Sequence, residues 1–205
     1  MPAQALHRGD TREVYYHIYN RGVEKKVIFN DEEDYKVFLS YLNDYLTPPK
    51  DLDSIKKAFK IRGRVFRGTP HQPKNYFNKV VLIAYSLTPD RFRLLLHQVA
   101  EGSIEGLVRS LCTRYSMYFN KKYHRAGSLF EGPYKSVQIN EKPHLLHLTR
   151  SFHRAHGYSS YPEYLGDRMT SWVKPEVVFS SLGGGTGDHS SYKDFGSENE
   201  NCNYR

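Results

Sequence analysis

Hydrophobic and polar residues follow one another with a period that changes along the chain. Residues 80–87, VVLIAYSL, form a nearly unbroken apolar run rich in β-branched residues, which is typical of a central strand covered on both faces. Residues 88–90, Thr-Pro-Asp, predict a turn. From residue 91 to residue 97 the pattern alternates, so that one face carries Phe92, Leu94 and Leu96. We therefore expect a hairpin with a buried face and with Arg91 and Arg93 on the opposite face.

The other elements follow from similar patterns. Residues 14–20 alternate and predict a first strand. Asn30, with Glu33 three residues later, predicts a capped helix over residues 31–46. Ser103 predicts the N-cap of a second helix that Gly127 closes. Residues 128–140 predict an edge strand interrupted at Pro133, and residues 143–156 a third helix. This order of elements predicts an α+β fold with a mostly antiparallel sheet and helices packed on it.

Two segments lack a sustained period. Residues 48–79 are basic, with scattered Phe, Gly and Pro, and predict an insertion within one domain that spans residues 1–182. Either its cations Arg62, Arg64, Arg67 and Lys74 contact a phosphate backbone, or the segment is a solvated loop; we favour the first. Residues 183–205 predict a Gly-rich linker and a polar tail, because the glycine run lacks the lysine of a phosphate-binding loop.

The third helix carries residues with more than one interpretation. Its expected apolar stripe is Leu145, Leu148, Phe152 and Ala155, and its neighbouring face holds His144, His147, Ser151 and Arg154. The two histidines could form a metal site or activate the serine, but without a third ligand we expect polar surface residues. Tyr115 and Tyr118 of the second helix could be nucleophiles, although their position on its apolar stripe favours the core.

Charge and composition indicate which class of molecule the protein binds. The net charge of the chain is +8. Residues 186–205 contribute −2 to this total, so the rest of the chain carries +10. Together with 17 Tyr and 11 Phe, this charge is typical of a nucleic-acid binder, but a basic protein whose tyrosines lie in the core would have the same composition, so composition alone does not decide between them. Two distant cysteines and the lack of a long apolar run predict a cytoplasmic protein without disulfides or membrane spans.

Several blocks resemble, in order, the REP-associated and related insertion-sequence tyrosine transposases. The resemblance extends over roughly residues 14–195. Its blocks are YHIYNRG (16–22), AYSLTPDRFRLLL (84–96), SLCTRYSMYFNKKYHRAGSLFEGPYKS (110–136), LLHLTRSFH (145–153), YSSYPEYLG (158–166) and SWVKPEVVFSS (171–181). The resemblance implies a ferredoxin-like fold. It also implies a single-stranded DNA substrate, cut by a tyrosine while two histidines hold Mg²⁺ or Mn²⁺ against the scissile phosphate.

This chain departs from the family at those positions. Arg91 and Arg93 stand where the resemblance places the two histidines, Ser151 where it places the tyrosine, and Ala155 where it places a polar metal ligand. A guanidinium offers only donors and repels a cation, so the resemblance implies that the metal site is lost and that no cofactor is held. A serine alkoxide is a far poorer leaving group than a phenoxide. We therefore expect nicking and strand transfer to be absent.

The binding chemistry survives these changes, because an arginine can grip a phosphate with two parallel hydrogen bonds and without metal. We expect a transposase-like protein, monomeric or homodimeric, that binds single-stranded or stem-loop DNA. Its candidate DNA contacts are Arg91, Arg93, Arg21, Arg109, Arg114, Lys121, Lys122, Lys135 and Arg150. An active transposase with an unrecognised site and an RNA-binding or regulatory module remain as alternatives.

Overall fold

The computed structural model describes residues 14–49, 57–61, 64–68, 74–154, 157–182, 189, 192 and 193. Its main sheet has the strand order β6-β1-β5-β4-β7, and each neighbouring pair is antiparallel. The strands are β1 (Tyr15–Arg21), β4 (Val80–Thr88), β5 (Arg91–Gln98), β6 (Lys135–Ile139) and β7 (Tyr158–Ser159). The helices that cover this sheet are α1 (Glu32–Leu46), α2 (Ser103–Lys122), α3 (Lys142–Arg154), α4 (Tyr161–Leu165) and α5 (Glu176–Ser181).

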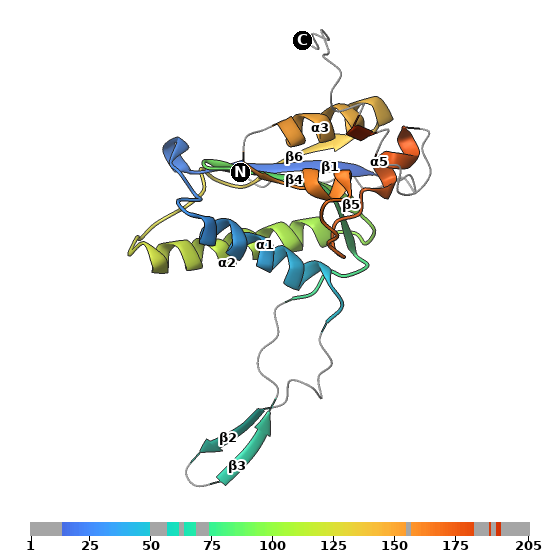
Figure 1. Cartoon of the computed structure of the whole chain (residues 1–205). Coiled ribbons are helices and arrows are strands. Elements are labelled where there is room, and N and C mark those ends of the chain that lie inside the picture. The colour runs from blue at the N-terminus through green and yellow to red at the C-terminus, as the bar shows by residue number, and fades with distance from the viewer. Residues whose placement is uncertain are drawn as a thin grey trace.

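The prediction of an α+β fold with an antiparallel sheet is confirmed. The series β1, α1, β4, β5, α2, β6 places its four strands in the order β6-β1-β5-β4, which is the ferredoxin-like arrangement. Figure 1 shows α1 and α2 on one face of the sheet and α3 and α5 on the other. A second, two-stranded sheet of β2 (Lys57–Ile61) and β3 (Arg64–Gly68) stands apart from the first.

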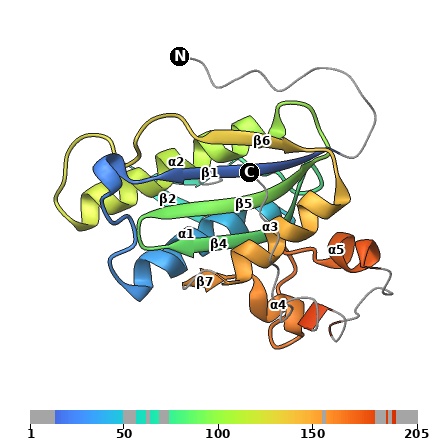
Figure 2. The same cartoon turned by 90° about the horizontal axis from the view of Figure 1, so that it is seen from above.

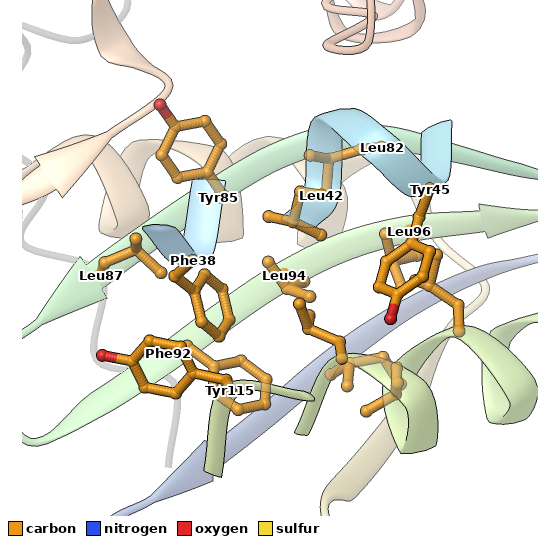
Figure 3. Packing of buried hydrophobic residues seen from close by; sticks show 14 of the residues in the cluster. Phe38, Leu42, Tyr45, Leu82, Tyr85, Leu87, Phe92, Leu94, Leu96 and Tyr115 are labelled. Atoms are coloured by element: carbon orange, nitrogen blue, oxygen red, sulfur yellow. The ribbon is translucent and has the colours of Figure 1, made fainter. Parts of the chain in front are cut away.

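The β4–β5 hairpin divides the core into two layers, as its sequence pattern predicts. On one face Phe92, Leu94 and Leu96 pack beneath α1 and α2, where the rings of Phe38 and Tyr115 lie 5.1 Å apart (Figure 3). On the other face Leu95 packs with residues of α3, α4 and α5. Burying side chains on both faces stabilises the central strands by about 1.5–3 kcal/mol for each fully buried large apolar residue.

The predicted N-caps of the first two helices, and the capping partner of the first, are wrong. The N-cap of α1 is Asp31 rather than Asn30, because the Asp31 carboxylate accepts the Asp34 N–H at 3.0 Å. The partner that completes this cap is Asp34, not Glu33, since its carboxylate accepts the Asn30 N–H at 2.8 Å. Ser103 is the first residue of α2 and follows Gly102 in the left-handed conformation (φ 69°).

The end of α2 and the following strand also differ from expectation. Tyr123 caps α2, well before Gly127. β6 begins only at Lys135, beyond the expected interruption at Pro133, and it is an edge strand as predicted. In α3, Leu145 and Phe152 of the expected stripe are buried, but Thr149 and Arg150 are buried too. Ala155 and the glycine run at 183–187 lie outside the described residues.

The basic insertion contains a hairpin, which the sequence pattern did not reveal. β2 and β3 pair in antiparallel register, with Phe59 opposite Phe66. The two ends of the insertion meet at one point, because the Asn75 side chain donates to the carbonyls of Asp44 (3.3 Å) and Thr47 (2.8 Å). The insertion is therefore an appendage that leaves and rejoins the domain at the end of α1 and the start of β4.

Candidate nucleic-acid interface

Basic side chains gather at one end of the sheet face that α3 partly covers. Arg21 of β1 lies opposite Arg91 of β5, and Tyr19 lies opposite Arg93 on one side and Lys135 of β6 on the other. Residues that face each other across antiparallel strands project to the same side of a sheet. We call Arg21, Arg91, Arg93 and Lys135, with Tyr19 among them, the basic floor.

The basic floor is open because α3 lies over the opposite end of the sheet face. Figure 2 looks down on this face and shows α3 crossing β5 and β4 away from the β4–β5 turn. Arg91 and Lys135 are exposed, and Arg21, Arg93 and Tyr19 are half-buried. The floor is thus a shallow, positively charged surface that a phosphate chain can reach.

Backbone contacts fix the end of the floor. Gly22 follows β1 and donates its N–H to the Asp90 carbonyl at 2.8 Å, while Ile28 donates to the Pro89 carbonyl at 2.7 Å. A Cβ at residue 22 would lie 2.1 Å from the Lys26 carbonyl oxygen, so only glycine fits this close approach. The turn that carries Asp90 and Arg91 is therefore held rigidly against the end of β1.

Two arginines of the floor are paired with carboxylates. The Arg91 guanidinium donates to both oxygens of Asp90, at 3.1 and 2.9 Å, and the hydrogen bond lowers the pKa of that carboxyl. Arg21 donates to both oxygens of Glu131, one of them at 2.8 Å, and lowers the pKa of Glu131 in the same way. Both pairs are exposed, so they orient the guanidiniums but contribute little to stability.

Arg93 has different surroundings. Its Nη1 donates to the Ser151 hydroxyl of α3 at 3.4 Å, and its guanidinium carbon lies 5.1 Å from the centre of the Phe152 ring. Burial, and next the charge of Arg91, lower its pKa. Its Nε is buried and has no hydrogen-bond partner among the described residues. Arg93 therefore places a partly desolvated positive charge at the edge of α3.

Aromatic rings line the floor beside these charges. Tyr19 stacks on His17 with ring centres 4.9 Å apart, and the Lys135 ammonium lies 5.9 Å from the Tyr19 ring. Burial, and next Arg93 and His144, lower the pKa of His17 to about 4, so this imidazole is neutral at pH 7. The sequence analysis did not single out His17 or Tyr19, although the alternation of residues 14–20 places both on the face of Arg21.

The remaining candidate contacts lie elsewhere. Arg109, Arg114, Lys121 and Lys122 belong to α2, on the other side of the sheet. Arg109 pairs with Glu105, and Arg114 pairs with Asp44 at 2.9 Å. Lys122 pairs with Asp31, Glu33 and the buried Asp34 at 2.8–2.9 Å. Arg150 of α3 is only 3% exposed. The structure thus brings four of the nine predicted contacts together.

The other predicted features are placed as follows. Tyr115 is fully buried and donates to the Ile28 carbonyl at 2.6 Å, which confirms its place in the core. Tyr118 is half-buried and donates to Asp34, and burial raises its pKa to about 12. His144 and His147 are exposed, as expected. The described residues contain no group of three or more metal-ligating side chains and no helix long and apolar enough to cross a membrane.

Fold and floor together define a ferredoxin-like α+β domain with a basic, aromatic sheet face. No protein-family model and no curated protein matches the chain. Among solved structures it is similar to a candidate transposase from Deinococcus radiodurans R1, with 16% identity, TM-score 0.40, and coverage of 76% of this chain and 100% of that one. It is also similar to a REP-associated tyrosine transposase bound to a REP hairpin, with 7% identity, TM-score 0.41, and coverage of 83% and 76%.

Proposed function

We propose that this chain is a transposase-like protein that binds single-stranded or hairpin DNA on its basic floor, and that it does not cut the DNA. The proposal combines the sequence motifs that resemble tyrosine transposases with the chemistry of the floor. It comprises two claims, binding and loss of nicking, which are tested separately below.

The observation that carries the proposal is the contact between Arg93 and Ser151. These residues are 58 positions apart in the sequence, and their side chains lie 3.4 Å from each other. The motif resemblance assigns one position to a metal ligand and the other to the attacking tyrosine, and these two groups must meet at a scissile phosphate. Their contact supports the assignment of both positions and so supports the transposase-like origin of the site.

The same contact explains why cutting is not expected. In a hydrogen bond from Arg93, the Ser151 oxygen acts as an acceptor, and a guanidinium cannot remove the serine proton. Two arginines, Arg91 and Arg93, repel a divalent cation at the place where the resemblance puts one. Without a metal or a base the serine hydroxyl remains a weak nucleophile.

Binding remains chemically favourable at this position. Arg21, Arg91 and Arg93 offer several N–H donors to phosphate oxygens, and a phosphate can replace the carboxylates of Asp90 and Glu131. Tyr19 lies between the cations and offers a ring on which a base can stack. Stacking on a ring requires an unpaired base, which favours single strands and loops over continuous duplex.

The binding claim is tested with the double variant Arg91→Ala/Arg93→Ala. We expect its affinity for single-stranded DNA to fall at least tenfold at about 0.1 M salt, and the slope of log K against log salt to shrink by about 1.4, or 0.7 per lost phosphate contact. The matched control is Lys36→Ala/Lys174→Ala, which removes the same charge from exposed positions outside the floor. Equal losses in both variants, or none in either, would show that the floor is not the binding surface.

The loss of nicking is tested with the wild-type protein. End-labelled single-stranded DNA from the flanks of its gene is incubated with Mg²⁺ or Mn²⁺ and run on denaturing and native gels. We expect an intact strand together with a native complex. A shortened strand linked to protein would establish an active transposase instead, and stronger binding of the matching RNA would favour the RNA-binding alternative.

A further inference from the structure

A small pocket lies at the end of α3, where this helix and α4 are side by side (Figure 2). Among the described residues it is lined by Arg150, His153 and Arg154 of α3, by Tyr161 of α4, and by Tyr192. Its volume is about 170 Å³, below the roughly 300–1,000 Å³ of sites for drug-sized molecules. The pocket, which we call the α3 pocket, therefore has room for a small ion or a terminal chemical group.

Hydrogen bonds hold the walls of the α3 pocket in place. The Nδ1 atom of His153 lies 2.6 Å from the Tyr192 hydroxyl, and its Nε2 atom lies 3.0 Å from the Ser160 hydroxyl. The His153 ring is also packed against the ring of Tyr161, with ring centres 5.3 Å apart. One side chain thus connects α3, the start of α4 and Tyr192. The pocket is therefore formed before a ligand arrives, which lowers the free energy that binding has to supply.

Two arginines give the α3 pocket its charge. Arg150 and Arg154 are four residues apart on α3, so their Cβ atoms lie about 5–6 Å from each other on one face of the helix. Arg150 is 3% exposed, whereas Arg154 is exposed, so one cation lies in the interior and the other at the surface. The described lining residues contribute these two positive charges and no Asp or Glu. An anion is therefore the ligand that this pocket favours.

An arginine does not have to be free of other contacts to bind such a ligand. A guanidinium carries five N–H donors, so an arginine that already makes hydrogen bonds within the protein retains donors for an anion. Each of these bonds is stronger in the interior than in water, because a medium of low polarity screens charge less. A small anion in the pocket can accept from the buried Arg150 and from the exposed Arg154 at the same time.

The number of donors selects among anions. A carboxylate has two oxygens, which a single guanidinium fork satisfies, whereas a terminal phosphate group has three free oxygens to share between two forks. A phosphate monoester also carries a charge of about −1.5 to −2 at pH 7, which two arginines balance. A phosphodiester within a DNA chain has only one negative charge and two free oxygens. The pair of arginines thus favours inorganic phosphate or a terminal phosphate group.

We propose that the α3 pocket binds a single phosphate group through Arg150 and Arg154. The group is supplied either by inorganic phosphate or by the phosphorylated end of a DNA strand, and the chemistry of recognition is the same for both. None of the described lining residues belongs to the basic floor. The inference therefore goes beyond the proposed function and does not require that the floor binds DNA.

The first test is calorimetric titration of the full chain with inorganic phosphate, at constant ionic strength. We expect saturable binding by the wild type and about tenfold weaker binding by Arg154→Gln, whose exposed position lets the variant fold. The matched control is Lys142→Gln, which removes one charge from an exposed position of the same helix and retains the wild-type affinity. Acetate, with its two oxygens, binds more weakly than phosphate. Equal binding of acetate and phosphate would contradict the proposal.

The basic floor also attracts phosphate, so its contribution is measured separately. In Arg91→Ala/Arg93→Ala we expect the affinity for inorganic phosphate to stay within threefold of the wild type. Loss of phosphate binding in this floor variant, together with normal binding in Arg154→Gln, would overturn the α3 pocket as the site.

Two single-stranded DNAs distinguish the sources of the phosphate group. One carries phosphates at both ends, and the other has the same sequence with hydroxyls at both ends. If a strand end occupies the pocket, the phosphorylated strand binds about tenfold more tightly, and Arg154→Gln removes the difference. If inorganic phosphate is the ligand, the two strands bind alike and the calorimetric signal depends on Arg154. Absence of both effects would overturn this inference, whereas failure of both strands to bind would overturn the proposed function alone.

Protection from chemical modification locates the site directly. Phenylglyoxal modifies exposed arginines, and peptide mass spectrometry reports the rate at each position. We expect phosphate to slow the modification of Arg154 and to leave Arg109, an exposed arginine of α2, unchanged. Equal protection of both arginines, or none of Arg154 at saturating phosphate, would contradict binding in the α3 pocket.

Discussion

Two floor arginines are held by carboxylates that resemble the ligand they are proposed to bind. Asp90 accepts two hydrogen bonds from Arg91, and Glu131 accepts two from Arg21. A carboxylate and a phosphate offer similar pairs of oxygen acceptors to the guanidinium fork. Asp90 and Glu131 therefore orient the arginines in the free protein and compete with DNA for them.

This competition predicts that removing one carboxylate strengthens binding. Asp90→Asn retains the shape of the side chain but releases Arg91 from its ion pair, so we expect affinity for single-stranded DNA to rise about three- to tenfold. Glu32→Gln, in an exposed pair with Lys36 on α1, changes the net charge equally and serves as the control. Fluorescence anisotropy with a labelled strand measures both. An equal rise in both variants would show a general charge effect instead.

How far single residues could be predicted depends on what surrounds them. The positions of Arg91 and Arg93 on the face opposite Phe92 follow from strand alternation alone, and the structure confirms them. The surroundings of Lys122 could not be predicted in this way, because its partners Asp31 and Asp34 lie at the start of α1, about ninety residues earlier in the sequence. Arg150 likewise becomes buried through contacts between segments that helical periodicity does not describe. The local sequence pattern therefore predicts on which face of an element a side chain lies, whereas its exposure depends on packing between distant segments.

At the level of elements, α3 is docked next to two neutral histidines. His17 of β1 lies beneath it, with its ring centre 5.3 Å from that of Phe152. His153 of α3 contacts the Tyr192 hydroxyl at 2.6 Å and the Ser160 hydroxyl at 3.0 Å. Burial lowers the pKa of His153 to about 3 and is the largest cause of the pKa of about 4 at His17. Protonation of either imidazole therefore costs free energy in the folded protein, where α3 packs against them.

This arrangement predicts that acid destabilises the protein. In the unfolded chain a histidine takes up a proton near pH 6.5, whereas His153 in the fold resists protonation down to about pH 3. The stabilisation is complete above pH 6.5 and is lost as the pH falls, by about 2 kcal/mol for this one histidine at pH 5. Urea unfolding at pH 7.5 and pH 5, followed by the fluorescence of the single tryptophan, measures the change.

The variant His153→Gln isolates this contribution. Its free energy of unfolding is lower than that of the wild type at pH 7.5, but it falls less between pH 7.5 and pH 5, because one proton-linked step is missing. His147→Gln, at an exposed position of the same helix, retains the wild-type dependence on pH. A wild-type slope in His153→Gln would mean that this imidazole is not the group that titrates.

Elements with a long, consistent pattern could be predicted from the sequence, and short ones could not. The β4–β5 hairpin, α1, α2 and α3 each carry enough apolar positions to show their period. The two residues of β7, and the short helices α4 and α5, are too brief to show one. The β2–β3 hairpin was missed because its two strands have only five residues each and lie in a segment without a sustained period.

Over the whole molecule, the sheet separates two groups of basic side chains. On the face that α1 and α2 cover (Figure 1), Arg109, Arg114 and Lys122 of α2 are paired with carboxylates. The basic floor lies on the other face, at the end of the sheet that α3 leaves uncovered (Figure 2). A DNA strand bound on the floor, as proposed, would therefore lie beside α3 and would be separated from the cations of α2 by the sheet.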